Sequence, residues 1–169
     1  KAFKMDASNK KYKKWNDLLY YCKFSANPVG RFVIDVVNEK QDVEKIYKAS
    51  DNLCTALQII NHIQDCKKDF KLLKRVYIPD SLFKKYSLDK EILNKDKSIE
   101  SFRKLKIEII DNVLESLKNT KLGLLKIRSW RLRKETLIIL NIAKRLCYLL
   151  KRNDPLEKTD RKSTRLNSS

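Results

Sequence analysis

The chain has 169 residues, of which 42% are hydrophobic, and this is enough for one domain with its own core. Only 2 glycines and 3 prolines are present, so turn-rich β architectures are disfavoured and an all-α fold is expected. The formal net charge of +18 comes mainly from lysines spread along the chain rather than from one arginine-rich face. A basic nucleic-acid-binding module is therefore only an alternative interpretation, and no nucleic acid partner is expected.

The first 37 residues are predicted to contain a helix end, a polar loop and a second helix that is then interrupted. Residues 2–6 are typical of a helix end, residues 7–14 of a polar loop, and residues 15–24 of a second helix. Residues 25–30 are predicted to interrupt it, because Pro28 removes a backbone donor and Gly30 permits close backbone approach. The break either lines a cavity or is a plain interhelix turn, and an apolar run follows over residues 32–37.

The apolar period of the remaining chain predicts further helices. One long helix is expected over residues 43–67, followed by a loop over 70–79 that ends at a proline. Residues 80–86 and 89–93 are predicted short helices with acidic starts suited to capping. Residues 99–119 are amphipathic, and residues 122–150 are predicted to form another long helix that Asn-Asp-Pro at 153–155 stops.

Three oxygen-bearing side chains, Asn61, Asp65 and Asp69, are spaced four residues apart. Residues i and i+4 share a helix face, so the three are predicted to form one stripe. Carboxylates are ionised at pH 7, and hard oxygen ligands suit Mg²⁺, which also takes water and substrate phosphate into its shell. Nearby basic residues, including Arg75, would hold that phosphate. The alternative is an ordinary solvated helix face.

Other kinds of site have less support in the sequence. Cys22, Cys54, Cys66 and Cys147 form no Cys-x-x-Cys pair, and His62 is the only histidine. A zinc site, a disulfide framework or a histidine-based catalytic set is therefore not expected. No run of 18 apolar residues and no signal peptide are visible, so we expect a cytoplasmic protein with reduced thiols.

Three motifs in order resemble the squalene/phytoene synthase family. Residues 21–31, Tyr-Cys-Lys-Phe-Ser-Ala-Asn-Pro-Val-Gly-Arg, are similar to its Tyr-Cys…Val-Gly segment. Residues 55–69, Thr-Ala-Leu-Gln-Ile-Ile-Asn-His-Ile-Gln-Asp-Cys-Lys-Lys-Asp, resemble its second aspartate-rich motif, and residues 75–79 resemble the Arg-x-Tyr-x-Pro that follows. The resemblance extends over residues 2–150. The sequence Ser-Ala-Asn-Pro-Val-Gly-Arg is most like that of the bacterial hydroxysqualene synthase branch of hopanoid biosynthesis.

The resemblance implies an all-α isoprenoid-synthase helical fold around an apolar cavity. Two aspartate-rich helices would bind diphosphate through Mg²⁺ at its mouth. Carried over by motif, the expected site residues are Asp65 and Asp69 as metal ligands, Tyr21 as the catalytic residue that stabilises carbocations, and Arg75, Gln58, Asn61 and Gly30 as substrate- or diphosphate-binding residues.

The implied activity is Mg²⁺-dependent conversion of presqualene diphosphate to hydroxysqualene with release of diphosphate. The alternatives are a squalene or phytoene synthase that joins two prenyl diphosphates such as farnesyl diphosphate head to head, and a non-catalytic homologue. Because the products are apolar, peripheral contact with the inner face of the membrane is also expected.

The family's first aspartate-rich motif is absent, and we expect it upstream of Lys1. Residues 1–155 are therefore interpreted as the C-terminal portion of a single isoprenoid-synthase domain, inactive alone. Residues 156–169 are predicted to form a disordered tail, of which 160–169 resemble a translated sequencing adapter.

Overall fold

One long helix, α4 (Val43–Gln64), lies at the centre of the structure and contacts α2, α3, α7, α8 and α9. The structure is a computed structural model that describes residues 1–157. Apolar side chains recur along α4 at helical spacing, and Ile46, Leu53, Ile60 and Ile63 are buried. Because several faces of α4 carry such residues, this helix can be covered from more than one side.

The elements of the described residues are all helical, as the composition predicted. In chain order they are α1 (Ala2–Ala7), α2 (Trp15–Ser25), α3 (Asn27–Val36), α4, α5 (Cys66–Lys68), the π-helix η1 (Asp69–Leu73), α6 (Asp80–Lys85), the 3₁₀-helix η2 (Lys90–Asn94), α7 (Glu100–Ser116), α8 (Thr120–Leu124) and α9 (Trp130–Arg152).

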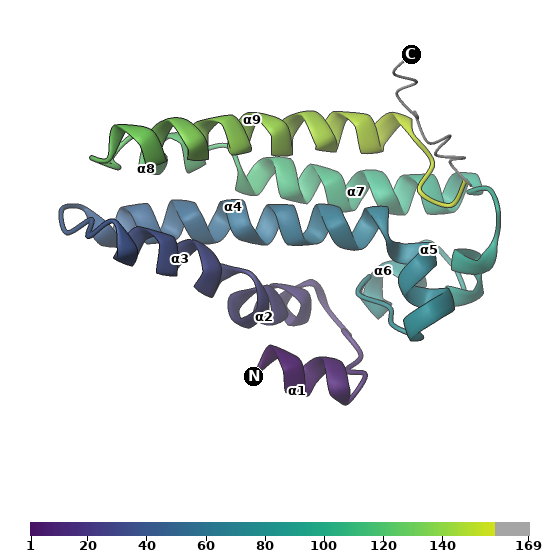
Figure 1. The fold of residues 1–169 in the computed structure, drawn as a ribbon. Coiled ribbons are helices and arrows are strands. Elements are labelled where there is room, and N and C mark those ends of the chain that lie inside the picture. The colour runs from purple at the N-terminus through teal and green to yellow at the C-terminus, as the bar shows by residue number, and fades with distance from the viewer. Residues whose placement is uncertain (158–169) are drawn as a thin grey trace, which may run out of the picture.

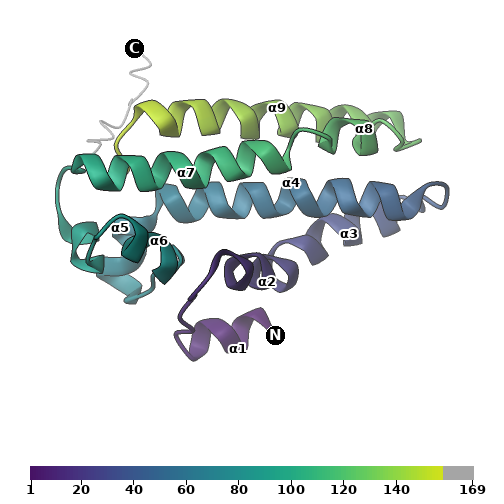
Figure 2. The same cartoon turned by 180° about the vertical axis from the view of Figure 1, so that it is seen from behind.

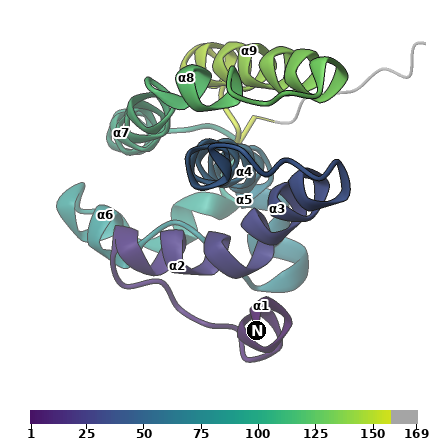
Figure 3. The same ribbon diagram turned by 90° about the vertical axis from the view of Figure 1, so that its left-hand side faces the viewer.

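These helices form layers on both sides of α4. Helices α7 and α9 lie side by side along one side of α4, whereas α1 and α2 lie on the other (Figure 1). The view from behind shows the same arrangement, with α5 and α6 gathered at the end of α4 where that helix stops (Figure 2). A view along the helices shows α4 enclosed between the α7–α9 layer and the α2–α3 layer (Figure 3).

The predicted break at residues 25–30 is shorter than expected. Only Ala26 separates α2 from α3, and Pro28 lies in the first turn of α3. A proline is tolerated there because the amide of that position has no partner within the helix. Gly30 is therefore inside α3, where an added Cβ would lie 2.3 Å from Ser50 Oγ and 2.7 Å from Cys54 Sγ of α4. The glycine permits close packing of two helices and does not lie at the break.

The helix predicted over residues 122–150 was wrong at its start. Helix α8 ends at Leu124, and α9 begins at Trp130 after a turn. Two contacts explain the separation. The Ser129 side chain accepts a hydrogen bond from the amide of Leu132 at 3.4 Å, which caps α9. The buried carboxylate of Glu39 accepts from the amides of Arg128 at 3.0 Å and Ser129 at 2.7 Å.

The expectation of one helix over residues 43–67 followed by a loop also needs correction. Helix α4 ends at Gln64, and α5 and the π-helix η1 follow it. Lys74 then adopts a left-handed conformation with φ 54°, and the amide of Arg75 donates to the carbonyl of Asp69 at 3.1 Å. Residues 70–73, predicted as loop, thus belong to a widened helical turn that begins at the last residue of the aspartate-rich motif.

Ordered structure continues beyond residue 155. Leu156, predicted as part of a disordered tail, is fully buried, and its carbonyl accepts a hydrogen bond from Lys67 Nζ at 2.7 Å. Residues 158–169 of that tail, which include the adapter-like residues 160–169, lie outside the described residues. Between residues 1 and 157, none of the helices has the length and apolar character needed to cross a membrane.

Candidate active site

The aspartate-rich motif lies where α4 gives way to α5 and η1. The amide of Asp65 donates to the carbonyl of Asn61 at 2.9 Å, and the amide of Asp69 donates to that of Asp65 at 2.8 Å. These bonds preserve the i,i+4 spacing across the end of α4, and the charges of Asp65 and Asp69 interact. Burial raises the pKa of Asp69, and the negative charge of Asp65 raises it further. The two carboxylates therefore repel one another, and a bound cation would relieve that repulsion.

The donor set fits Mg²⁺ only if substrate and water complete the coordination shell of the ion. Within residues 1–157, no group of three or more histidine, cysteine, aspartate or glutamate side chains is arranged to hold a metal ion. Asp65 and Asp69 supply two carboxylates, and Asn61 lies one helical turn before Asp65. Mg²⁺ in proteins commonly takes one or two carboxylates and completes its octahedron with water and substrate phosphates. This arrangement matches such an open site and not a closed protein cage.

Tyr21 lies in a buried aromatic cluster. Its ring centroid is 5.6 Å from that of Tyr12 and 5.4 Å from that of Tyr77. Its hydroxyl donates to Asp6 Oδ2 at 3.1 Å, and the hydroxyl of Tyr77 donates to Asp6 Oδ1 at 3.2 Å. Burial raises the pKa of the Tyr21 hydroxyl, and the proximity of Tyr77 and Asp6 adds to the effect. Tyr21 is therefore a neutral phenol at physiological pH.

His62 connects the cluster to α4. Its ring stacks on Tyr77 with centroids 3.6 Å apart and an interplanar angle of 13°. Its Nε2 lies 3.2 Å from Nε2 of Gln58, one of the predicted site residues. Burial lowers the pKa of His62 to about 3, so the imidazole is neutral. His62 thus contacts side chains on two sides and places Gln58 beside the tyrosine cluster.

Arg75 lies between the cluster and the aspartate pair. One guanidinium nitrogen donates to the backbone carbonyl of Asp6 at 3.2 Å. The positive charge of Arg75 is also close enough to lower the pKa of Asp69 against the dominant effect of burial. Arg75 is half-buried and so has part of its surface available to a ligand. Its position is compatible with the predicted contact to diphosphate.

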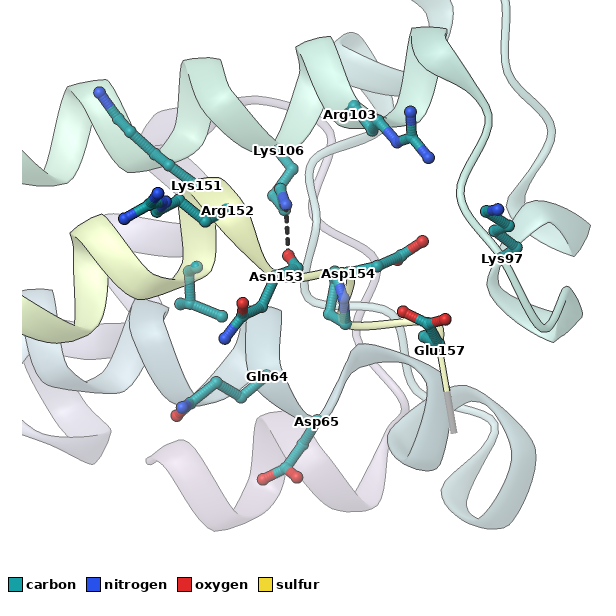
Figure 4. Close-up of a pocket in the computed structure, with 12 residues that line it drawn as sticks. Gln64, Asp65, Lys97, Arg103, Lys106, Lys151, Arg152, Asn153, Asp154 and Glu157 are labelled. Atoms are coloured by element: carbon teal, nitrogen blue, oxygen red, sulfur yellow. Dashed lines mark hydrogen bonds between the residues drawn. The ribbon is translucent and has the colours of Figure 1, made fainter. Parts of the chain in front are cut away.

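A cavity of about 780 Å³ opens beside the end of α4. Figure 4 shows Gln64 and Asp65 on one side of it, with Arg103 and Lys106 of α7 on the opposite side. Lys106 is buried, and its ammonium donates to the carbonyl of Asn153 at 2.6 Å. The basic lining residues are Lys97, Arg103, Lys106, Lys151 and Arg152, and the acidic ones are Asp65, Asp154 and Glu157. Lys151 also pairs with Asp111 at 2.5 Å, so the lining as a whole carries only a small excess of positive charge.

The structure brings most of the predicted site residues together and separates one. Gln58 joins Tyr21 through His62 and Tyr77, and Arg75 reaches the same cluster through Asp6. Gly30, predicted to line the helix break, instead faces Ser50 and Cys54 between α3 and α4. The cavity beside Asp65 does not include Tyr21 or Tyr77 among its lining residues.

Sequence reasoning missed three members of the cluster, and one of them is Tyr12, which is buried although residues 7–14 were predicted as a polar loop. For Tyr77 a usable signal exists, because it is the tyrosine of the Arg-x-Tyr-x-Pro motif at residues 75–79. Asp6 was predicted only as part of a helix end. No local pattern distinguishes it, because its partners Tyr21 and Tyr77 lie 15 and 71 positions further along the chain.

Comparison with known proteins gives a consistent set of similarities. The model of the family "Squalene/phytoene synthase" matches residues 1–167. Hydroxysqualene synthase of Sinorhizobium fredii is 38% identical over 161 residues, which cover 92% of this chain and 52% of that protein. Hydroxysqualene synthase of Rhodopseudomonas palustris is 36% identical over 155 residues, with the same two coverages. The chain thus spans about half the length of these curated relatives.

More distant similarities agree with this result. The chloroplastic phytoene synthase of Daucus carota is 27% identical over 106 residues, which cover 60% of this chain and 26% of that protein. Among solved structures, the crystal structure of squalene synthase HpnC from Alicyclobacillus acidocaldarius matches with a TM-score of 0.79 at 24% identity. The match covers 89% of this chain and 56% of that one. At this identity the likeness establishes the helical fold.

Proposed function

Because the chain belongs to the squalene/phytoene synthase family, we propose that it forms the C-terminal portion of a synthase that converts presqualene diphosphate to hydroxysqualene and diphosphate. The observation that carries this proposal is the arrangement around Arg75. This residue lies between the carboxylate pair Asp65 and Asp69 and the buried cluster of Tyr21 and Tyr77. A charged group and an apolar chain of one substrate would occupy these two environments.

The acidic end of the site would hold the diphosphate through Mg²⁺. Asp65 and Asp69 would be the metal ligands, and Asn61 and Gln58 would support them from α4. When bound, Mg²⁺ neutralises the charge that builds on the leaving diphosphate. Arg75 would contact the diphosphate directly, and the basic residues around the adjacent cavity attract the same anion. Gly30 would act at a distance, by keeping α3 packed closely against α4.

The aromatic end would protect and stabilise the carbocation. Breaking the carbon–oxygen bond leaves the electron pair on diphosphate and a positive charge on the hydrocarbon, which rearranges before water adds and a proton is lost. The faces of Tyr21 and its neighbours attract such a cation without reacting with it. The hydroxyl hydrogens of Tyr21 and Tyr77 are directed at Asp6, so they are not available to the reacting carbons.

A second candidate activity is head-to-head joining of two prenyl diphosphates, as in squalene or phytoene synthases. The similarity to plant phytoene synthases favours this alternative. The same residues would serve it, because joining also begins with Mg²⁺-assisted loss of diphosphate. The identity of the substrate therefore separates the two activities.

The test uses the complete gene product that contains this chain, with Mg²⁺ and either presqualene diphosphate or farnesyl diphosphate. We expect hydroxysqualene from presqualene diphosphate, and a loss of at least about a hundredfold in kcat for Asp65→Ala and Asp69→Ala. Glu115→Ala, which removes an exposed carboxylate of α7, is the matched control and keeps full activity. Full activity in Asp65→Ala would contradict the metal site, and turnover of farnesyl diphosphate alone would favour the second activity.

We also propose that the synthase is cytoplasmic and contacts the inner face of the membrane peripherally, because its product is apolar. The net charge of +18 favours anionic lipid headgroups. Sedimentation with vesicles checks this. Binding to vesicles that contain phosphatidylglycerol and weaker binding to phosphatidylcholine vesicles are expected, and no binding to either would contradict the proposal.

A further inference from the structure

Asp6 joins three segments of the chain that are distant in sequence. Its Oδ2 accepts the hydroxyl of Tyr21 from α2 at 3.1 Å, and its Oδ1 accepts the hydroxyl of Tyr77 at 3.2 Å. Its backbone carbonyl accepts from the guanidinium of Arg75 at 3.2 Å. Each carboxylate oxygen thus accepts from a different phenol, and these hydrogen bonds join α1 to the site beside the buried Met5.

The rings around Asp6 are restrained on several sides. Tyr12 contacts Tyr21 edge-on, with centroids 5.6 Å apart and an interplanar angle of 69°, and stacks on Tyr77 at 5.7 Å. His62 covers Tyr77 with its centroid 3.6 Å away. This packing holds the rings in place, but it leaves each hydroxyl free to rotate about its carbon–oxygen bond. The hydroxyls of Tyr21 and Tyr77 also interact with one another, and Asp6 is the carboxylate to which both hydroxyls donate.

A phenol that donates to a carboxylate is polarised by it. The negative charge of the acceptor increases the electron density of the phenol oxygen and ring, and the effect is strong in a buried site. A more electron-rich ring attracts a cation more strongly. The arrangement therefore connects α1 to α2 and also increases the electron density of the tyrosine ring that would face a carbocation.

We propose that Asp6 is a positioning residue that directs the Tyr21 hydroxyl away from the reacting carbons and increases the electron density of the Tyr21 ring. The inference rests on the proposed function for the role of Tyr21, but the contact itself can be tested separately. Tyr77 belongs to the same unit, since its hydroxyl keeps the carboxylate of Asp6 oriented toward Tyr21.

The kinetic test uses the complete gene product and presqualene diphosphate, with Asp6→Asn, Tyr21→Phe and the double variant. Asparagine has the shape of aspartate, but its amide nitrogen can donate and cannot accept. We expect Asp6→Asn to lower kcat by at least about tenfold while KM changes by less than about threefold. The double variant should be no slower than the slower single variant, because both changes remove the same interaction.

A second kinetic cycle covers the case in which Asp6→Asn does not fold. Tyr77→Phe keeps the ring that stacks on His62 and removes only its hydroxyl, and its effect on kcat should also be non-additive with Tyr21→Phe. Tyr12→Phe is the matched control, since Tyr12 belongs to the same cluster but makes no hydrogen bond to Asp6 in the described structure. Its effect should be small and additive. Additive losses in both cycles, or an effect on KM alone, would overturn the proposal.

An independent measurement does not require turnover. Tyrosine labelled with ¹³C at the ring carbon that bears the hydroxyl reports hydrogen bonding of that hydroxyl by NMR. The Tyr21 signal, assigned with Tyr21→Phe, should move in Asp6→Asn and stay unchanged in Tyr12→Phe. An unmoved signal in Asp6→Asn overturns the proposal whatever the activity. Failure of the proposed function is recognised separately, by full activity in Asp65→Ala or by no turnover in the unmodified protein.

Discussion

Replacing Gly30 with alanine tests whether the close contact between α3 and α4 matters for stability. The added Cβ would lie 2.3 Å from Ser50 Oγ and 2.7 Å from Cys54 Sγ. Both separations are well below van der Waals contact, so these side chains or the helices must move. Ser50 is buried, which limits the directions in which its hydroxyl can turn.

Two opposing effects determine the expected size of the change. Alanine is favoured over glycine inside a helix by about 1 kcal/mol. Overpacking a well-packed contact costs about 1–3 kcal/mol. We therefore expect Gly30→Ala to lower the free energy of unfolding by about 1 kcal/mol, with a decrease in melting temperature of roughly 2–4 °C for a chain of this size.

A second background isolates the steric part of this effect. When Ser50 and Cys54 are both replaced with alanine, the two atoms that would clash with the new Cβ are gone, and the nearest remaining Ser50 atom, Cβ, lies 3.6 Å away. In this background Gly30→Ala should stabilise the protein by up to about 1 kcal/mol. Urea unfolding followed by circular dichroism measures both cases. Equal effects of Gly30→Ala in the two backgrounds, within about 0.5 kcal/mol, would refute the reasoning.

Further substitutions test other contacts. Glu39→Ala should lower the free energy of unfolding by about 1–3 kcal/mol, because two amides at the start of α9 lose their acceptor, whereas exposed Glu44→Ala should change it by less than about 0.5 kcal/mol in the same urea titration. Since burial lowers the pKa of His62 to about 3, below the unfolded value of 6.5, stability should fall as pH decreases from about 6.5 to about 3. The slope approaches about 1.4 kcal/mol per pH unit, and His62→Phe should remove that contribution; an unchanged slope would contradict a buried neutral imidazole. Gly123→Ala should destabilise more than Gly30→Ala, because its Cβ would meet the backbone carbonyl of Lys45 at 2.9 Å, which cannot rotate away; equal thermal stabilities would contradict this.

Several features of the fold follow from local sequence patterns. The apolar period located α2, α4 and α7, and the proline and acidic residues located the short helices α6 and η2. The four-residue spacing of Asp65 and Asp69 placed their side chains on one stripe, and helical hydrogen bonds preserve that spacing across the end of α4. These features are predictable because helix formation and side-chain direction depend on residues within one or two turns.

Other features required the tertiary structure. The turn before α9 exists because Glu39, far away in sequence, binds the amides of Arg128 and Ser129. Leu156 is ordered because its side chain is buried in the core and its carbonyl accepts a hydrogen bond from Lys67. In both cases the deciding partner lies 89 or 90 positions away, so no local pattern contains the signal.

The same distinction applies to the candidate site. The sequence by itself determined the family, the carboxylate pair and the choice of Tyr21 and Arg75, because these belong to motifs read along the chain. Only the tertiary structure decided that Asp6 joins Tyr21 to Tyr77 and that Gly30 serves the packing of α3 on α4. The physical reason is that hydrogen bonds and close packing between distant segments depend on which helix faces are buried against one another, and that choice is made by the whole core.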